Sequence, residues 1–378
     1  MDDSKSVANL GTPLGGDLGA IERELAAFWK AATQHPDEAV LIRAVSCNLI
    51  VIARDQSEAE SLPPVLGRVA EWHPCRSLVA FQQSEKAGAD LPPIQGWIRV
   101  QCTPQLGGRQ QVCSEMITVG VNPAAAESLS NTLVSLLVPD LPVFLYWRSP
   151  GAAERNLVKS LARFAHLLVV DSQALFRDPV NREHLSASLA HVPEGAEVRD
   201  LNWPRLTPWR DLIAQFFDTR AARTHLKELA KVEIRCAFSH ESATPLALLL
   251  AGWLASRLGW QWVSAEKGRG QWISRWRGAA GEVSVLFISA SADSARTGIK
   301  AVRLTTRSGC SFSVFENEET DCMTAVADGC TSNPVVHTVA RASANEADLL
   351  ISELSQLEED TGFQAARAAA LELEKGFR

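Results

Sequence analysis

Three short apolar runs separated by helix-like segments constrain the fold of the first half of this chain most strongly. Residues 40–53 and 142–148 are mostly apolar, and 166–172 contains the apolar run LLVV, as buried strands usually do. Apolar residues recur at helical spacing between these runs, in 56–72 and again from about residue 152. This alternation of strand and helix predicts a mixed or mostly parallel sheet with helices packed against it.

The second half has a different pattern. Alternation of apolar and polar residues with a period of two predicts strands at 271–277, 283–289, 298–306 and 310–316. A polar stretch with two prolines and a glycine, 191–204, precedes this half and is typical of a linker. We therefore predict an N-terminal α/β domain with a mixed sheet over 1–195, and a C-terminal α+β domain with a largely antiparallel sheet over 196–378.

Composition and charge narrow the class of partner. The chain is 46% hydrophobic and 21% charged, with a formal net charge of −7 and no cluster of basic residues. An acidic protein of this kind is a poor ligand for the phosphates of nucleic acid. The N-terminus is acidic and lacks the apolar segment of a secretory signal, and the apolar run at 246–255 is too short to cross a bilayer. We therefore expect a cytoplasmic protein that binds neither nucleic acid nor membrane.

Motifs for catalysis, metals or cofactors are missing from the sequence. It contains no GxSxG, HExxH, P-loop or GxGxxG after a strand. The eight cysteines form no CxxC pair, so we expect most of them to be small buried apolar residues, with Cys322 and Cys330 the most exposed. The eight histidines are scattered. The sequence thus predicts no catalytic residue, no metal site and no cofactor.

Two predicted strands of the first half end on residues whose side chains could bind a ligand. Asp171 and Ser172 follow one apolar strand, and Tyr146, Trp147 and Arg148 end another. Ligands of open α/β sheets gather at the carboxyl ends of strands, so these groups could face one crevice. The alternative is that Asp171 only caps the turn that follows it, as aspartate often does.

Tryptophan and arginine gather in the segment DLNWPRLTPWRDLIAQFF, residues 200–217. Trp203 and Trp209 alternate there with Arg205 and Arg210. Three interpretations remain open. The indoles could be core residues that lock the two domains together, they could form the energetic centre of a protein interface, or they could line a small-ligand pocket beside a helix N-terminus that attracts an anion.

Four stretches together resemble the glucose-6-phosphate dehydrogenase assembly protein family, OpcA. They are LVSLLVPDLPVFLYWR (133–148), VVDS (169–172), DLNWPRLTPWRDLIAQFFD (200–218) and LLLAGWLASRLGW (248–260). Their order and spacing match that family over roughly residues 20–260. The resemblance implies a non-catalytic partner that binds glucose-6-phosphate dehydrogenase, favours its active oligomer and acts as an allosteric activator in the oxidative pentose phosphate pathway.

With this resemblance, we predict that the chemically distinctive residues form a partner-binding surface. They are Trp147, Arg148, Asp171, Ser172, Asn202, Trp203, Arg205, Trp209 and Arg210. The alternative, from another class of function, is an enzyme or sensor that binds a sugar phosphate in a crevice between Trp147, Asp171 and Arg210.

Overall fold

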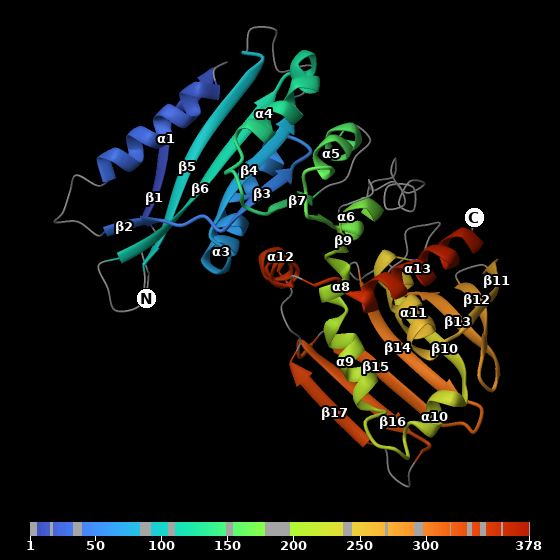
Figure 1. The fold of residues 1–378 in the computed structure, drawn as a ribbon. Coiled ribbons are helices and arrows are strands. Elements are labelled where there is room, and N and C mark those ends of the chain that lie inside the picture. Colours follow the sequence, from blue (N-terminus) through green and yellow to red (C-terminus); the bar gives the residue numbers. More distant parts are fainter. Residues whose placement is uncertain are drawn as a thin grey trace. The chain divides into compact units, whose positions relative to one another are not determined.

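The computed structural model divides the chain into two compact units (Figure 1). Unit 1 comprises Met1–Leu201 and Asn345–Leu357, and unit 2 comprises Asn202–Ala344 and Glu358–Arg378. The residues that the structure describes are 6–15, 18–32, 40–83, 92–104, 110–148, 154–177, 197–236, 244–268, 271–290, 298–317, 319–330, 335–340, 345–356 and 358–377.

Unit 1 is built on a mixed sheet with helices on both faces. Its described strands are β1 (Ser6–Gly15), β2 (Val40–Arg43), β3 (Cys47–Ile52), β4 (Cys75–Gln82), β5 (Ile94–Pro104), β6 (Gln110–Val121), β7 (Val143–Trp147), β8 (Leu167–Val170) and β9 (Glu197–Asp200). Its described helices are α1 (Leu18–Ala32), α2 (Gln56–Ser61), α3 (Pro63–Trp72), the short 3-10 helix η1 (Pro123–Ser128), α4 (Leu129–Ser135), α5 (Arg155–Ala162), α6 (Ser172–Arg177) and α12 (Glu346–Ser355).

The sheet of unit 1 confirms the expected mixed α/β architecture. Among the described residues its strand order is β1-β5-β6-β4-β3-β7-β8-β9, with β2 beside β6. The strands from β6 to β9 pair in parallel, whereas β1, β5 and β6 pair antiparallel. Parallel strands need a crossover between them, and the helices that follow β3, β6 and β7 supply these connections.

Alternation along β7 shows how the sheet acquires a core on each face. Phe144 and Tyr146 join the cluster that includes apolar residues of α3 and α12. Leu145 and Trp147 point to the other face and join residues of α4 and α5. Because neighbouring side chains of a strand point to opposite faces, a strand buried on both sides must be apolar at every position. Unit 1 is therefore a three-layer α/β structure.

Two predicted elements of unit 1 are corrected. The run 40–53 is two strands, β2 and β3, and not one. The helix-like segment 56–72 is two helices, α2 and α3, which meet at Leu62. Pro63 occupies the first position of α3, where its missing N–H costs nothing, but proline inside one continuous helix would remove a hydrogen bond.

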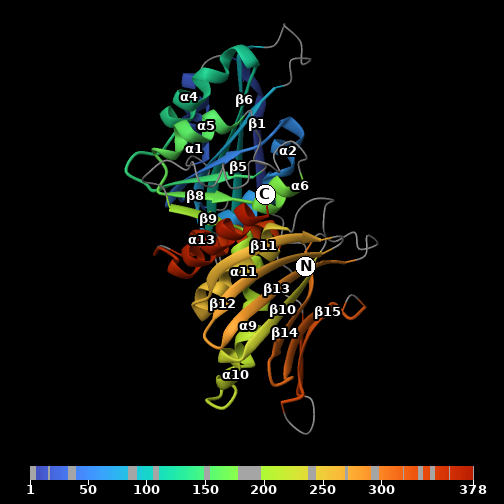
Figure 2. The same ribbon diagram turned by 90° about the vertical axis from the view of Figure 1, so that its right-hand side faces the viewer.

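Unit 2 holds the largely antiparallel sheet that the sequence predicts. Its described strands are β10 (Leu229–Cys236), β11 (Gln261–Gly268), β12 (Gln271–Gly278), β13 (Gly281–Ser289), β14 (Ile299–Thr306), β15 (Ser311–Asn317), β16 (Cys322–Asp328) and β17 (Val335–Ala340). Its described helices are α8 (Asn202–Arg205), α9 (Thr207–Gln215), α10 (Thr224–Lys227), α11 (Pro245–Leu258) and α13 (Thr361–Gly376). The order is β11-β12-β13-β10-β14-β15-β16-β17, and among these described strands only β10 and β13 pair in parallel. Figure 2 shows β12, β13, β10, β14 and β15 side by side.

Helices cover one face of this sheet. Trp276 and other inward-facing residues of the strands join apolar residues of α9, α11 and α13 in one core cluster. Helices α11 and α13 lie side by side (Figure 1), and a side chain at Gly252 would overlap the backbone of Ala366. A threonine followed by proline predicts a helix start, and α11 begins there: Thr244 caps it by accepting a hydrogen bond from the Ala247 N–H, and Pro245 follows.

The division into units differs from the predicted division in two elements, because β9 and α12, which the prediction placed in the C-terminal domain, both lie in unit 1. The predicted boundary between 195 and 196 touches residues outside the described part of the chain. Helix α12, which the prediction assigned to the C-terminal domain, belongs to unit 1, where Leu350 and Leu354 enter the core beside α3. Among the described helices, none has both the length and the hydropathy needed to cross a bilayer.

Candidate partner-binding site

The predicted site residues fall into two groups, one in each unit. In unit 1, Trp147 ends β7 and Asp171 directly follows β8. The two strands are parallel neighbours, with Trp147 opposite Val170. Their carboxyl ends therefore share one edge of the sheet, as the sequence predicts. In unit 2, Asn202, Trp203 and Arg205 lie on α8, and Trp209 and Arg210 lie on α9.

Arg148 is clamped by a carboxylate that the sequence analysis did not assign to it. The Glu346 carboxylate accepts hydrogen bonds from Arg148 Nε at 2.6 Å and Nη2 at 2.8 Å, and from the Tyr146 hydroxyl at 2.9 Å. Ser61 Oγ accepts a further bond from Arg148 Nη1 at 3.0 Å, and Glu58 lies 3.5 Å away. Arg148 thus fixes α12 to the edge of the sheet.

The electrostatics of this network follow from burial and pairing. Burial raises the pKa of Tyr146 well above its ordinary value, and the nearby negative charges of Glu346 and Asp171 add to the effect. Burial acts to lower the pKa of Arg148, but the hydrogen bonds and charge of Glu346 outweigh it, so the net shift is upward. Arg148 therefore stays cationic and Tyr146 stays a neutral donor.

Asp171 and Ser172 serve the start of α6. Asp171 Oδ1 accepts a hydrogen bond from the Gln173 N–H at 3.1 Å, and Asp200 Oδ1 accepts one from the Ser172 N–H at 3.3 Å. These N–H groups open the helix and have no partner within it. The capping role of Asp171 is therefore confirmed, and its contact with a partner stays a prediction.

Trp147 is unsuited to the sugar-binding crevice of the alternative hypothesis. Its side chain packs in the core below α4 and α5 and is only 4% exposed. A sugar that stacks on an indole needs an open ring face, and Trp147 offers none.

In unit 2, Trp203 joins two helices. Its Nε1 donates a hydrogen bond of 2.6 Å to Asp360 Oδ2, and its ring packs against Phe363 with a centroid distance of 5.6 Å. Asp360 is also the N-cap of α13, because its Oδ1 accepts from the Phe363 N–H at 2.8 Å. One carboxylate thus satisfies both an indole and a helix end, and it ties α8 to α13. Trp203 is a core residue of unit 2.

The two arginines of this segment lie over the buried groups. The Arg210 guanidinium stacks on the Trp203 ring, 3.5 Å from its centroid, and its Nη2 donates to Thr207 Oγ1 at 2.9 Å. Arg205 Nη1 donates to Asn202 Oδ1 at 3.0 Å. Both arginines are half-buried, so part of each side chain reaches solvent. Stacking and hydrogen bonding restrict the rotamers of both side chains.

Burial divides the nine predicted residues into two classes. The side chains less than 5% exposed are Trp147, Ser172, Asn202, Trp203 and Trp209. The half-buried ones are Arg148, Asp171, Arg205 and Arg210. Partner binding stays a prediction for this set, but in this conformation direct contact is open only to the second class. Within the first class, Asn202 and Trp203 hold Arg205 and Arg210 in place.

A groove in unit 1 was not found from the sequence. It has a volume of about 320 Å³ and lies over β4, β5 and β6 beside α2. Trp97 stacks on Phe81 at 6.1 Å between ring centroids, and Arg99 and Thr118 are among the polar lining residues. Trp97 and Arg99 stand two positions apart on β5, so their side chains point to the same face of the sheet. The groove forms because the helices cover this face only in part. The sequence of the strand does not show where the helices pack, so it could not predict the groove.

Two arrangements of cysteine were also missed. Cys102 and Cys113 form a disulfide between directly opposed residues of β5 and β6. Cys310 and Cys330 lie with His225 in a cluster of possible metal ligands. Burial raises the pKa of the Cys330 thiol to about 12, and the neighbouring Cys310 adds to the shift. Cys322 and Cys330 are half-exposed, as predicted.

Comparison with known families identifies the chain. A model described as the glucose-6-phosphate dehydrogenase subunit N-terminal domain matches residues 67–187, and one described as the C-terminal domain of the same subunit matches residues 196–367. The chain belongs to the glucose-6-phosphate dehydrogenase assembly protein family, OpcA.

Relatives of the OpcA family are found among cyanobacterial proteins. The "Putative OxPP cycle protein OpcA" of Nostoc punctiforme is 31% identical over 56% of this chain and 43% of its own length. The protein of the same name from Synechocystis is 30% identical over 52% of this chain and 39% of its own length. The match thus spans less than half the length of these relatives. Among solved structures, an oxidoreductase from Bacillus cereus aligns at 10% identity with a TM-score of 0.49, over 88% of this chain and 95% of the other.

Proposed function

We propose that this chain is a non-catalytic assembly partner of glucose-6-phosphate dehydrogenase, which favours the active oligomer and raises its affinity for substrate. One observation carries the proposal. Two models described as domains of a glucose-6-phosphate dehydrogenase subunit match consecutive parts of the chain, 67–187 and 196–367, in the expected order. The names of the cyanobacterial relatives, which refer to the OxPP cycle, support the same pathway.

The activation has a thermodynamic requirement. An activator shifts an enzyme only if it binds the active form more tightly than the inactive form. Coupling between sites is typically about 1–3 kcal/mol, which corresponds to a roughly 5- to 150-fold change in substrate affinity. Because coupling is reciprocal, glucose 6-phosphate must tighten the complex by the same factor.

Arg205 and Arg210 are the contact residues that we propose first. Arginine is enriched at the energetic centres of interfaces. Arg210 rests on Trp203 and Arg205 bonds to Asn202, so both side chains lose less conformational entropy on binding than free ones would. The whole chain has a net charge of −7. A partner that is recognised through the two cations nevertheless needs an acidic patch, because potentials across an interface are complementary.

The activation is tested by titrating the cognate dehydrogenase with the full chain. NADPH formation is followed at glucose 6-phosphate concentrations below half-saturation, and the complex is sized by gel filtration with light scattering. We expect co-elution and a fall in the half-saturating substrate concentration. No co-elution together with unchanged kinetics refutes the proposal, whereas co-elution without a kinetic effect leaves a scaffold and removes the activation.

The contact residues are tested by Arg205→Glu and Arg210→Gln. Arg220→Glu serves as the matched control, because Arg220 is an exposed arginine of the same unit. We expect the first two variants to weaken the complex at least about tenfold, a typical effect for an interface arginine, while Arg220→Glu leaves it unchanged. If binding is unaltered and only the melting temperature falls, the two arginines stabilise unit 2 and the contact lies elsewhere.

A further inference from the structure

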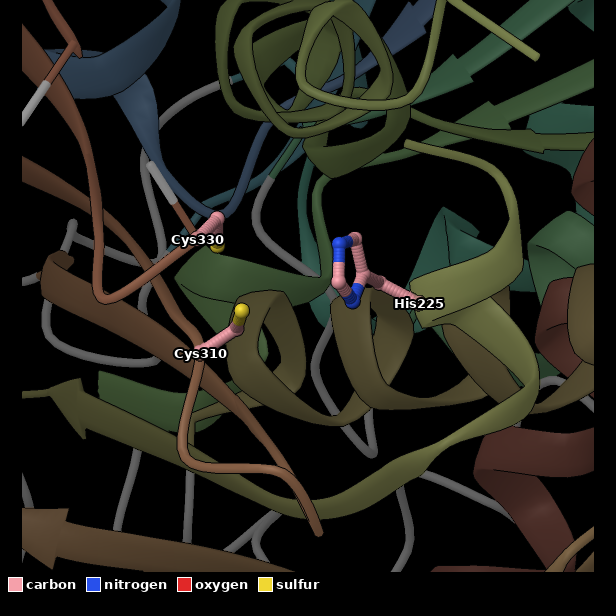
Figure 3. A group of neighbouring side chains, drawn as sticks. All are labelled: His225, Cys310 and Cys330. Carbon is pink, nitrogen blue, oxygen red and sulfur yellow. The ribbon is translucent and has the colours of Figure 1, made fainter. Parts of the chain in front are cut away.

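Three side chains with affinity for soft metal ions converge at one end of the sheet in unit 2 (Figure 3). His225 lies on α10, Cys310 directly precedes β15 and Cys330 follows β16. Each offers one ligand atom, and these atoms all lie within 4.8 Å of one another. Figure 3 shows the imidazole of His225 directed toward the two cysteines. The residues are 85 and 20 positions apart in the chain, so no spacing motif predicted them.

The backbone around the cysteines is shaped to bring the thiols together. Each cysteine follows a glycine with positive φ, Gly309 at 92° and Gly329 at 74°. A side chain on Gly329 would lie 3.1 Å from the Gly309 carbonyl oxygen, tighter than most real contacts. Left-handed glycines and a close approach of two chain segments allow a geometry that other residues resist. The pair of Gly-Cys turns therefore sets the separation of the two sulfurs.

Hydrogen bonding leaves the ligand atoms available to an ion. Cys310 Sγ donates to the Gly329 carbonyl at 3.3 Å, and Cys330 Sγ makes a long contact of 3.6 Å with the Asp328 carbonyl. The Nδ1 atom of His225 is buried and has no hydrogen-bond partner among the described residues. An unsatisfied buried nitrogen often marks the place of a water molecule or an ion.

Accessibility and rigidity complete the site. Cys310 is buried, whereas His225 and Cys330 are half-exposed, so an ion can enter from solvent. The His225 ring packs on Phe312 with 5.8 Å between the ring centroids, and Phe312 belongs to the core of unit 2. A ligand held by a core aromatic ring is pre-positioned for binding.

We propose that His225, Cys310 and Cys330 bind one Zn²⁺ ion, with water in the fourth position. Two thiolates and one imidazole are a ligand set that suits zinc, and three protein ligands with an open position form a known type of zinc site. In a tetrahedral site with Zn–S of about 2.3 Å and Zn–N of about 2.1 Å, the ligand atoms lie about 3.6–3.8 Å apart. The ligand atoms therefore have to approach one another by about 1.2 Å at most.

The bound ion ties the short helix α10 to the ends of β15 and β16. Helix α10 has four residues and no side-chain N-cap, so its own hydrogen bonds stabilise it poorly. A metal that holds His225 to two strand ends would fix it to the sheet. Binding is expected to release protons from the thiols, because the metal ligand is the thiolate.

The proposal is tested by metal titration of the full chain, purified with a reductant and freed of metals by a chelator. Zn²⁺ binding is measured by calorimetry, and Co²⁺ is used as a spectroscopic probe. We expect one Zn²⁺ per chain, a thiolate-to-Co²⁺ charge-transfer band with the intense visible bands of tetrahedral Co²⁺, and a melting temperature that rises with Zn²⁺.

Variants decide whether these residues are the ligands. Cys330→Ser and His225→Asn should each weaken Zn²⁺ binding by more than about a hundredfold, because even groups behind the ligands contribute about 10- to 100-fold. Cys310→Ser should weaken binding in the same way. Because Cys310 is buried, its replacement could also disturb folding, so the test relies on the two half-exposed positions. Cys322→Ser is the matched control, a half-exposed cysteine outside the cluster that should bind as the unchanged chain does.

Three results overturn the proposal. The first is no stoichiometric Zn²⁺ binding by the reduced chain. The second is Zn²⁺ binding by Cys330→Ser and His225→Asn that is as tight as binding by the unchanged chain. The third is a Cys310–Cys330 disulfide that mass spectrometry detects and that persists in the reductant. Circular dichroism of the metal-free variants confirms that lost binding is not lost folding.

Discussion

Replacing Glu346 by glutamine should release α12 from unit 1 with almost no change of side-chain volume. The Glu346 carboxylate accepts two hydrogen bonds from Arg148 and one from Tyr146. Glutamine retains one acceptor oxygen, but it removes the negative charge and turns an amide N–H₂ toward the guanidinium. The expected result is a weaker attachment of the helix and an intact sheet.

The magnitude follows from the burial of the pair. Removing one partner of a fully buried ion pair costs about 3–5 kcal/mol, whereas an exposed pair contributes about 1 kcal/mol or less. The side chains of Arg148 and Glu346 are 20% and 22% exposed, and Glu58 remains 3.5 Å from Arg148 as a partial substitute. We therefore expect a loss of about 2–3 kcal/mol for Glu346→Gln.

Hydrogen exchange measured by mass spectrometry locates this loss. A helix that opens locally exchanges in proportion to its opening equilibrium, so 2–3 kcal/mol corresponds to roughly 30- to 150-fold faster exchange of the amides in α12. Glu60→Gln, on the exposed side of α2, is the control and should change nothing there. In the double variant with Arg148→Met, much of the protection should return, because no uncompensated charge remains. Exchange of α12 less than about threefold faster in Glu346→Gln would refute the reasoning.

Three further predictions concern stability. Glu115→Gln should lower the free energy of unfolding of unit 1 by about 2–4 kcal/mol in urea, because it removes the buried carboxylate that pairs with Arg76 at 2.9 Å and with Arg43 at 2.6 Å and leaves Arg76 with Glu22 as its remaining ion-pair partner; a loss below about 1 kcal/mol would contradict this. Gly252→Ala should cost unit 2 about 1–3 kcal/mol, seen as a lower melting temperature, because the new Cβ overlaps the backbone of Ala366; an unchanged melting temperature would show that α11 and α13 can move apart. Because the pKa of Tyr146 is raised in the folded chain, the unfolded chain loses its phenolic proton at a lower pH than the folded one. The contribution of Tyr146 to the free energy of unfolding is therefore fully present below about pH 10, and it falls by about 1.4 kcal/mol per pH unit above that. Tyr146 is the single tyrosine, so tyrosinate absorbance follows this ionisation directly, and Tyr146→Phe should flatten the slope.

Local patterns determine most of the elements that were predicted correctly. Thr244 followed by Pro245 predicts a helix start because the cap and the proline act within one turn. Alternation in 271–277 predicts that Trp272, Ser274 and Trp276 share a face, and Ser274 and Trp276 are buried there. These inferences need only neighbouring residues, so sequence alone supports them.

The break at Pro63 could be read locally, but the incorrect assignment of α12 and the missing contacts of the site residues depend on distant partners. Nothing near Glu346 indicates that it pairs with Arg148, 198 residues earlier, so α12 was assigned to the wrong half. The residues around Trp203 in the sequence do not distinguish a core residue from an interface residue. The hydrogen bond to Asp360, which is distant in the sequence, makes that distinction. The cluster of His225 and the two cysteines likewise appears only when α10 and two strand ends are brought together.

The assignment of α12 to unit 1 has a consequence for synthesis of the chain on the ribosome. Residues 346–355 contribute Leu349, Leu350 and Leu354 to the core of unit 1, and they emerge only after almost all of unit 2 has been made. Until then the face of the nascent sheet that receives them is incomplete, and a partly folded intermediate with uncovered apolar side chains is prone to aggregate. The core of unit 1 must therefore wait for a segment that is synthesised after all the described strands of unit 2, and a gene fragment cut after residue 201 would encode unit 1 without α12.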